Sequence, residues 1–82
     1  MRKPVKLSEL GALSAKSRIE ICGNREAVIE GCCGILEYGD GVVRIRTQER
    51  IVRFTGRGLV IRCMTEDALV VTGYILQIEF ME

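Results

Sequence analysis

The chain has 82 residues, and its 12 basic and 11 acidic side chains leave a net charge of +1 at pH 7. This length allows one domain and no more. The absence of histidine excludes Ser–His and Cys–His nucleophile pairs. No apolar run reaches the length of a membrane-spanning helix, and no signal peptide opens the chain. We therefore expect a soluble protein on the cytosolic side.

The first segment, residues 1–16, differs from the rest because it is basic and is interrupted by a proline and a glycine. Leu7, Leu10 and Leu13 recur there at helical spacing, so the segment is expected to be either a short helical turn or a frayed terminus. Residues 17–82 are expected to form one β domain.

Seven short apolar runs, separated by glycine-rich or polar breaks, predict β-strands. They span residues 18–22, 27–30, 35–38, 42–47, 51–55, 59–64 with 69–72, and 74–80. The predicted fold is all-β, with seven or eight short, mainly antiparallel strands in a meander. Because a sheet with one apolar face cannot lie flat in water, it is expected to close into a barrel or fold into a sandwich. A β-solenoid is the alternative, which the lack of a fixed repeat disfavours.

Alternation of apolar and polar residues predicts the register of the hairpins. Tight two-residue turns are expected where glycine comes first, at 56–57 and at 73–74. The stretch 31–34 holds two glycines and is expected to bulge or bend. The expected pairs are Ile45 with Val52, Val43 with Phe54, Phe54 with Leu59, Cys63 with Leu69, and Val71 with Leu76. The expected buried residues are Val43, Ile45, Val52, Phe54, Leu59, Ile61, Val71, Leu76 and Ile78.

The four cysteines, Cys22, Cys32, Cys33 and Cys63, lack the secretory context of a disulfide framework. Cys32 and Cys33 are adjacent, so they project to opposite faces of a strand and are too close for a CxxC metal knuckle. Cys63 continues the phase of the apolar residues before it and is interpreted as a small core residue. We expect reduced structural thiols; a disulfide or thiol sensor, and a zinc site, are the alternatives.

The charges are unevenly distributed, with arginines concentrated in residues 42–62. The simplest interpretation is a solvated outer face of the sheet. A second interpretation is a basic patch for an acidic partner or anionic headgroups, with Arg44, Arg46, Arg53 and Arg62 as the candidate contacts. Nucleic-acid binding is a third, disfavoured because no aromatic side chain accompanies these arginines to stack on bases.

No residue pattern indicates catalysis, so we expect no enzyme, no cofactor, no metal site and no small-molecule substrate. The Gly56–Arg57–Gly58 sequence, for example, has too few glycines and no following lysine for a phosphate-binding loop.

The expected sheet has edge strands at 18–22 and 74–80 unless they pair with each other. The second of these contains no lysine to protect its edge. Strand addition there would bury Phe80, and Ile78 and Phe80 are the candidate contacts. A homo-oligomer is therefore expected.

Several short pieces of the sequence together resemble the YabP/YqfC family of sporulation proteins. They are residues 19–25, 28–30, 34–38, 56–59 and 78–80. The Gly23–Asn24–Arg25 turn and the Glu37–Tyr38 pair are more similar to the YqfC-like branch, whereas Cys32–Cys33 departs from the polar residues expected at that loop.

The resemblance implies a non-catalytic protein of endospore-forming bacteria that acts in the cytoplasm of the mother cell, peripheral to the forespore membrane. It also implies a YqfD-like membrane protein as partner. The alternative function is a small β-barrel that binds nucleic acid through the arginine face of residues 42–62.

Overall fold

A computed structural model describes residues 17–81, and these residues form six β-strands and no helix. The strands are β1 (Arg18–Cys22), β2 (Glu26–Glu30), β3 (Cys32–Tyr38), β4 (Val42–Thr47), β5 (Ile51–Cys63) and β6 (Ala68–Met81). All pair antiparallel in one sheet of order β1-β2-β6-β5-β4-β3. The all-β prediction is confirmed, and the antiparallel order rules out the solenoid. The predicted arm at 1–16 lies outside the described residues.

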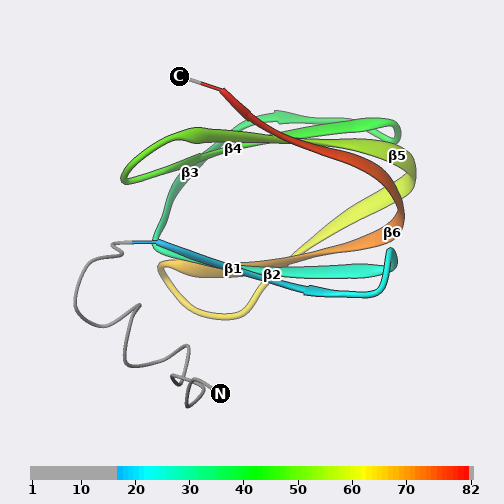
Figure 1. Ribbon diagram of the computed structural model, residues 1–82. Helices are drawn as coiled ribbons and strands as arrows, with labels where there is room; N and C mark the ends of the chain where they lie inside the picture. The colour runs from blue at the N-terminus through cyan, green and yellow to red at the C-terminus, as the bar shows by residue number, and fades with distance from the viewer. Residues whose placement is uncertain (1–16, 82) are drawn as a thin grey trace, which may run out of the picture.

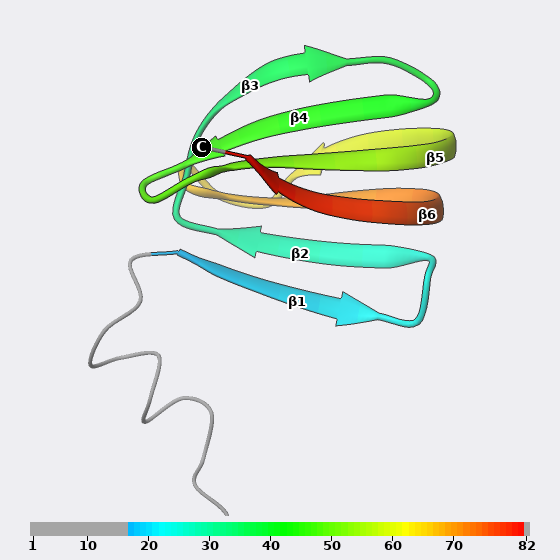
Figure 2. The same cartoon turned by 45° about the horizontal axis from the view of Figure 1, so that its top comes forward.

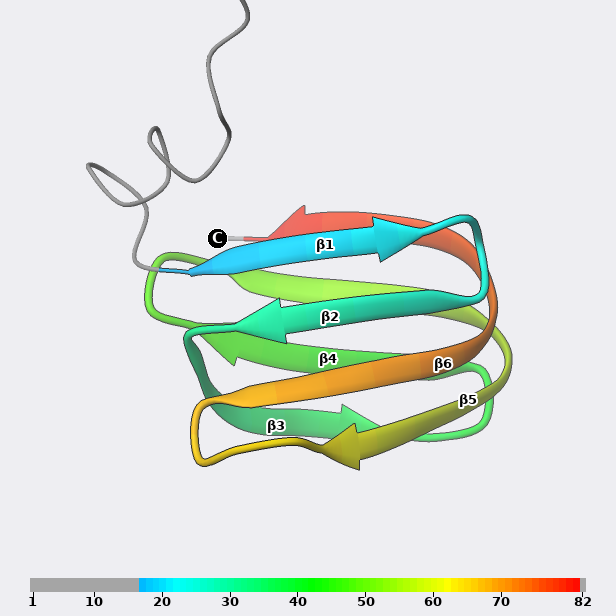
Figure 3. The same ribbon diagram turned by 90° about the horizontal axis from the view of Figure 1, so that it is seen from below.

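The sheet folds over on itself into two layers because β5 and β6 are long and strongly curved (Figure 1). One layer holds β1, β2, the first part of β6 and the last part of β5 (Figure 3). The other holds β3, β4, the first part of β5 and the end of β6 (Figure 2). Of the two predicted forms, barrel or sandwich, the barrel is not the one found, because the sheet stays open, and its two layers correspond to the sandwich (Figure 1). The uninterrupted meander is wrong, because β2 is followed in the sheet by β6 and not by β3.

Two expected hairpin turns are instead bends within single strands, which reduces the seven or eight predicted strands to six. β5 continues through Gly56 and β6 continues through Gly73. Gly73 has a φ of +127°, and a Cβ there would lie 2.5 Å from the carbonyl oxygen of Gly58. Glycine in a strand interior often marks such a close approach of two backbones. Both glycines are therefore required by the bend between the layers.

Each bend is held by the tip of a hairpin that is distant in sequence. The β3–β4 tip accepts hydrogen bonds from β5, and the β1–β2 tip accepts them from β6. The donors and acceptors are Gly56 N to Gly41 O, Leu59 N to Asp40 O, Gly73 N to Arg25 O and Ile75 N to Asn24 O, at 2.8–3.1 Å. The Arg25 guanidinium also lies 4.3 Å from the centre of the Tyr74 ring. The curvature of the sheet is thus fixed by backbone contacts that satisfy N–H groups at the bends.

The core lies between the two layers and contains most of the residues that the alternation predicts. The buried residues are Ala27, Ile29, Val43, Ile45, Val52, Phe54, Leu59, Leu69, Val71 and Ile75, while Ile61 and Ile78 pack against this cluster and are partly buried. The prediction is wrong for Leu76, which is 63% exposed. A register shift pairs Thr55 with Gln77 and Gly56 with Ile75, so Leu76 is the extra residue of a β-bulge.

The predicted register is confirmed where strands alternate without interruption. Val43 pairs with Phe54 and Ile45 with Val52, and Cys63 pairs with Leu69 across the 65–67 connection. The expected pairs Phe54 with Leu59 and Val71 with Leu76 are wrong, because each lies within one continuous strand. The expected bend at 31–34 is confirmed by a φ of 82° at Gly31 and a register shift between Cys32 and Gly34.

Candidate functional site

The open sheet leaves two gaps between the layers, which we call seams. The β1–β6 seam lies between β1 and the last residues of β6, and it contains a hollow of about 400 Å³. The β3–β5 seam lies between the start of β3 and the end of β5, and it contains a hollow of about 200 Å³. These seams are where the fold exposes its interior.

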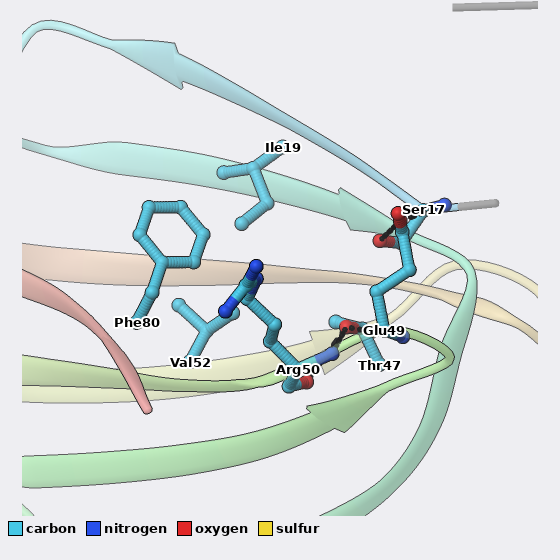
Figure 4. Close-up of a pocket in the computed structure, with 7 residues that line it drawn as sticks. All are labelled: Ser17, Ile19, Thr47, Glu49, Arg50, Val52 and Phe80. Atoms are coloured by element: carbon cyan, nitrogen blue, oxygen red, sulfur yellow. Dashed lines mark hydrogen bonds between the residues drawn. The ribbon is translucent and has the colours of Figure 1, made fainter. Parts of the chain in front are cut away.

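The larger hollow has an apolar floor and a polar rim (Figure 4). Ile19 of β1, Val52 of β5 and Phe80 of β6 form the floor. Val52 and Phe80 are paired across the two strands, and Phe80 remains 62% exposed. Such exposure of a large apolar side chain beside a hollow makes Phe80 a candidate for contact with another molecule.

Hydrogen bonds order the rim of the same hollow. The backbone N and Oγ of Ser17 donate to Glu49 Oε1 at 3.2 and 2.8 Å. The buried hydroxyl of Thr47 donates to Arg50 O at 2.7 Å and accepts from Arg50 N at 3.0 Å. The rim therefore joins the residue before β1 to the β4–β5 turn.

Strand edges run along both sides of this hollow. Within residues 17–81, β1 pairs only with β2, and residues 77–81 of β6 pair only with β5. Both edges consequently present backbone N–H and C=O groups toward the seam. Of the two predicted edge contacts, Phe80 faces the hollow, whereas Ile78 pairs with Phe54 and packs against the core.

The layer that contains β3 and β4 carries a row of four charged side chains on its outer face. One side chain comes from each of the strands β3, β4, β5 and β6. Glu37 pairs with Arg44, Arg44 with Arg53, and Arg53 with Glu79. Arg44 Nε donates to Glu37 Oε1 at 2.8 Å, and Arg53 Nη2 donates to Glu79 Oε1. The row thus balances its two positive charges with two negative ones.

The other two arginines of the predicted contact face are not part of this row. Arg46 lies two residues beyond Arg44 on the same face of β4 and makes no ion pair with any described residue. Arg62 pairs across the sheet with Val70 and therefore lies in the other layer. The structure does not bring the four predicted arginines together on one surface.

The smaller hollow gathers three of the four cysteines. Cys32, Cys33 and Cys63 line it, while Cys22 lies at the far end of the β1–β2 hairpin. The prediction that Cys63 is a core residue is wrong, since Cys63 is exposed and Cys32 packs against the core instead. Among residues 17–81 no group of cysteine and carboxylate side chains has a geometry that could hold a metal ion.

Burial raises the pKa of the Cys32 thiol, the contact of its sulfur with the Gly34 carbonyl oxygen partly opposes this, and repulsion from Cys33, Cys63 and Asp67 adds smaller upward contributions. Sequence reasoning missed this grouping of cysteines because it depends on the start of β3 and the end of β5 lying side by side, and these are far apart in sequence.

These features define a small all-β protein built from one open antiparallel sheet that folds into two layers. No helix that could cross a membrane is found in the part of the chain described here. The sequence model of the YabP family matches residues 14–82, and the chain belongs to this family. Membership indicates a sporulation-associated protein. No curated protein and no solved structure matches the chain.

Proposed function

We propose that the chain is a non-catalytic sporulation protein that works as an interaction module in the cytoplasm of the mother cell. It docks on the cytosolic segment of a membrane protein at the forespore. Family membership supports the link to sporulation. The observation that carries the docking role is Phe80, which is 62% exposed and lies on the part of β6 whose second edge pairs with no other described strand.

Strand addition is the mode of docking that this geometry favours. An extended segment of the partner pairs with the outer edge of residues 77–81 and satisfies their backbone groups. One apolar side chain of that segment enters the 400 Å³ hollow and contacts Phe80 and Ile19. Backbone pairing supplies affinity, and the fit of the hollow supplies specificity.

The Gly23–Asn24–Arg25 turn and the Glu37–Tyr38 pair support a place in the YqfC-like branch, for which a YqfD-like membrane protein is the proposed partner. In the absence of that partner, the same edge pairs with a second copy of the chain. The isolated protein is then a homo-oligomer that uses Phe80 at its interface.

Nucleic-acid binding is the weaker alternative. Arg44 and Arg53 each have a glutamate partner, so this part of the arginine face carries little net positive charge. Binding of a single-stranded oligonucleotide that weakens steeply with salt would favour the alternative over docking.

Complementation in an endospore-forming host tests the proposal. The gene is deleted, and heat-resistant spores are counted after expression of the wild type, Phe80→Asp or Leu76→Asp. The two variants are matched, because both residues belong to β6 and are 62% and 63% exposed. We expect Phe80→Asp to fail, and Leu76→Asp to restore spores, with both variants folded by circular dichroism.

Normal spore counts in the deletion strain, or full complementation by Phe80→Asp, would contradict the proposal. Light scattering on the purified proteins tests the oligomer separately. The wild type is expected to be larger than a monomer and Phe80→Asp to be monomeric. A monomeric wild type would contradict the proposed homo-oligomer.

A further inference from the structure

The three cysteines of the β3–β5 seam lie on two segments that the backbone holds together. The N–H groups of Gly31 and Cys32 both donate to the carbonyl oxygen of Asp67 at 2.9 Å. Asp67 belongs to the short turn that follows Cys63, and this turn is closed by a 3.0 Å bond from Met64 N to Ala68 O. The first residue of β3 is therefore attached to the turn that begins at the last residue of β5.

Burial and position in the strands single out one pair of these thiols. Cys32 packs against the core, whereas Cys33 is exposed and is the residue without a cross-strand partner at the register shift between Cys32 and Gly34. Cys63 lies two residues after Ile61, which also packs against the core, so it points to the same inner side at the open edge. Cys32 and Cys63 thus face the same 200 Å³ hollow from opposite sides of the seam.

Cys63 is also among the groups whose repulsion raises the pKa of Cys32, after burial and after the adjacent Cys33, as expected for a thiol that lines the same hollow. The buried Cys32 keeps its proton to higher pH than an ordinary thiol. Of these two thiols, the exposed Cys63 is accordingly the one that an oxidant in solution reaches first.

We propose that Cys32 and Cys63 form a reversible disulfide that closes the β3–β5 seam. Hydrogen peroxide oxidises the Cys63 thiolate to a sulfenic acid and is itself reduced to hydroxide. The Cys32 sulfur then attacks the Cys63 sulfur; the S–S bond forms, the S–O bond breaks, and the oxygen leaves as water with the Cys32 proton. A dithiol reductant reverses the bond and becomes a disulfide itself.

The bond would join the end of β5 to the start of β3 and so tie one layer to the other across an open edge. It closes a loop of about 30 residues, which restricts the unfolded chain strongly. Oxidation thereby converts the open seam into a closed one while the β1–β6 seam stays as it is. This inference does not depend on the proposed function.

Mass spectrometry of the full-length protein tests the site. Reduced protein is treated with hydrogen peroxide, remaining thiols are blocked with N-ethylmaleimide, and the protein is digested with trypsin. Cleavage after arginine separates Cys22 (residues 19–25), Cys32 with Cys33 (26–44) and Cys63 (63–82) into different peptides. We expect a mass loss of about 2 Da in the monomer, two blocked thiols of the original four, and a link between peptides 26–44 and 63–82.

Serine variants identify the two sulfurs. Cys63→Ser, at an exposed position, is expected to abolish the linked peptide, and Cys32→Ser to do the same. Cys22→Ser and Cys33→Ser are expected to keep it. A link that survives in Cys32→Ser, a bond found only between two molecules, or oxidation of Cys63 to the sulfinic acid with no link would each overturn the proposal.

Thermal unfolding provides an independent readout. Oxidation of the wild type is expected to raise the unfolding midpoint by at least about 10 °C. The same treatment should leave the midpoint of Cys63→Ser unchanged. An unchanged or lowered midpoint in the linked wild type would show that the bond strains the seam and would contradict its closure.

Discussion

Gly56 of β5 lies against Tyr74 of β6, so that a Cβ atom on Gly56 would sit 1.8 Å from the Tyr74 carbonyl oxygen. A methyl group cannot fit there unless the two strands separate at their bends. We expect Gly56→Ala to lower the free energy of unfolding by about 3 kcal/mol or more. Urea unfolding followed by circular dichroism measures the change.

Gly34→Ala is the matched control, because a Cβ on Gly34 meets no atom within 4 Å. Its effect should stay within about 1 kcal/mol and can be stabilising, since alanine restricts the unfolded chain. Equal losses in the two variants would mean that the close approach at the bend does not limit stability.

Phe54 and Phe80 show how differently the two phenylalanines contribute to stability. Phe54 is fully buried between the layers, and Phe80 is 62% exposed. We expect Phe54→Ala to cost about 3–5 kcal/mol, because it removes buried surface and leaves a cavity. Phe80→Ala should cost less than about 1 kcal/mol in the monomer. Chemical unfolding at low protein concentration distinguishes these effects from any effect on assembly.

The Thr47 hydroxyl closes the β4–β5 turn by bonding both backbone groups of Arg50. Thr47→Val keeps the shape of the side chain but removes both bonds in a buried position, so a loss of about 1–3 kcal/mol is expected. Thr65→Val, at an exposed turn, should change stability by less than about 0.5 kcal/mol. A neutral Thr47→Val variant would show that these two hydrogen bonds do not limit stability.

The two glutamates at the ends of the charge row offset the charges of Arg44 and Arg53, which are paired with each other across β4 and β5. The four side chains are about a third to a half exposed, so solvent screens their interactions. Glu37→Gln combined with Glu79→Gln is expected to cost about 1 kcal/mol at low salt and almost nothing near 1 M salt. Glu66→Gln, which breaks no ion pair among the described residues, provides the control. A salt-independent loss would point to packing instead of charge.

The raised pKa of Cys32 has a measurable consequence for its reaction with iodoacetamide, which requires the thiolate. In the folded protein the pH at half-maximal alkylation of Cys32 should be higher than in urea-unfolded protein. The stability that Cys32 contributes is complete below its unfolded-state pKa and is lost as the pH rises through the higher folded-state value. Alkylation at the same pH in both states would contradict the effect of burial.

The register of β4 and β5 could be predicted because both strands alternate without a break around a polar turn. The pairs of Val43 with Phe54 and of Ile45 with Val52 follow from that pattern alone. Gly56 and Gly73 could not be assigned in the same way. A glycine before a polar residue fits a tight turn, and it equally fits a bend where another backbone approaches. Only the distant strand distinguishes the two, and the bulge at Leu76 follows from the bend.

The candidate sites also differ in whether a local pattern or a distant segment determines them. Phe80 was identified as an edge contact because the composition of its own strand indicates an unprotected edge. The pairing of Arg53 with Glu79, and the placement of Cys32 and Cys63 along one hollow, depend on segments far apart in sequence. The sequence around each of these residues does not indicate which distant residue lies beside it. The alternation of apolar residues alone therefore predicts a core position for Cys63.

The position of β2 beside β6 has a consequence for the order of folding. Every other strand pair joins neighbours in the chain, whereas Glu26 pairs with Thr72 across nearly the whole domain. Closing such a long loop costs more entropy than closing a hairpin, and it slows folding. We therefore expect the four strands from β3 to β6 to assemble first and the β1–β2 hairpin to dock last. In native-state hydrogen exchange, the amides of β1 and β2 should consequently open before those of β4 and β5.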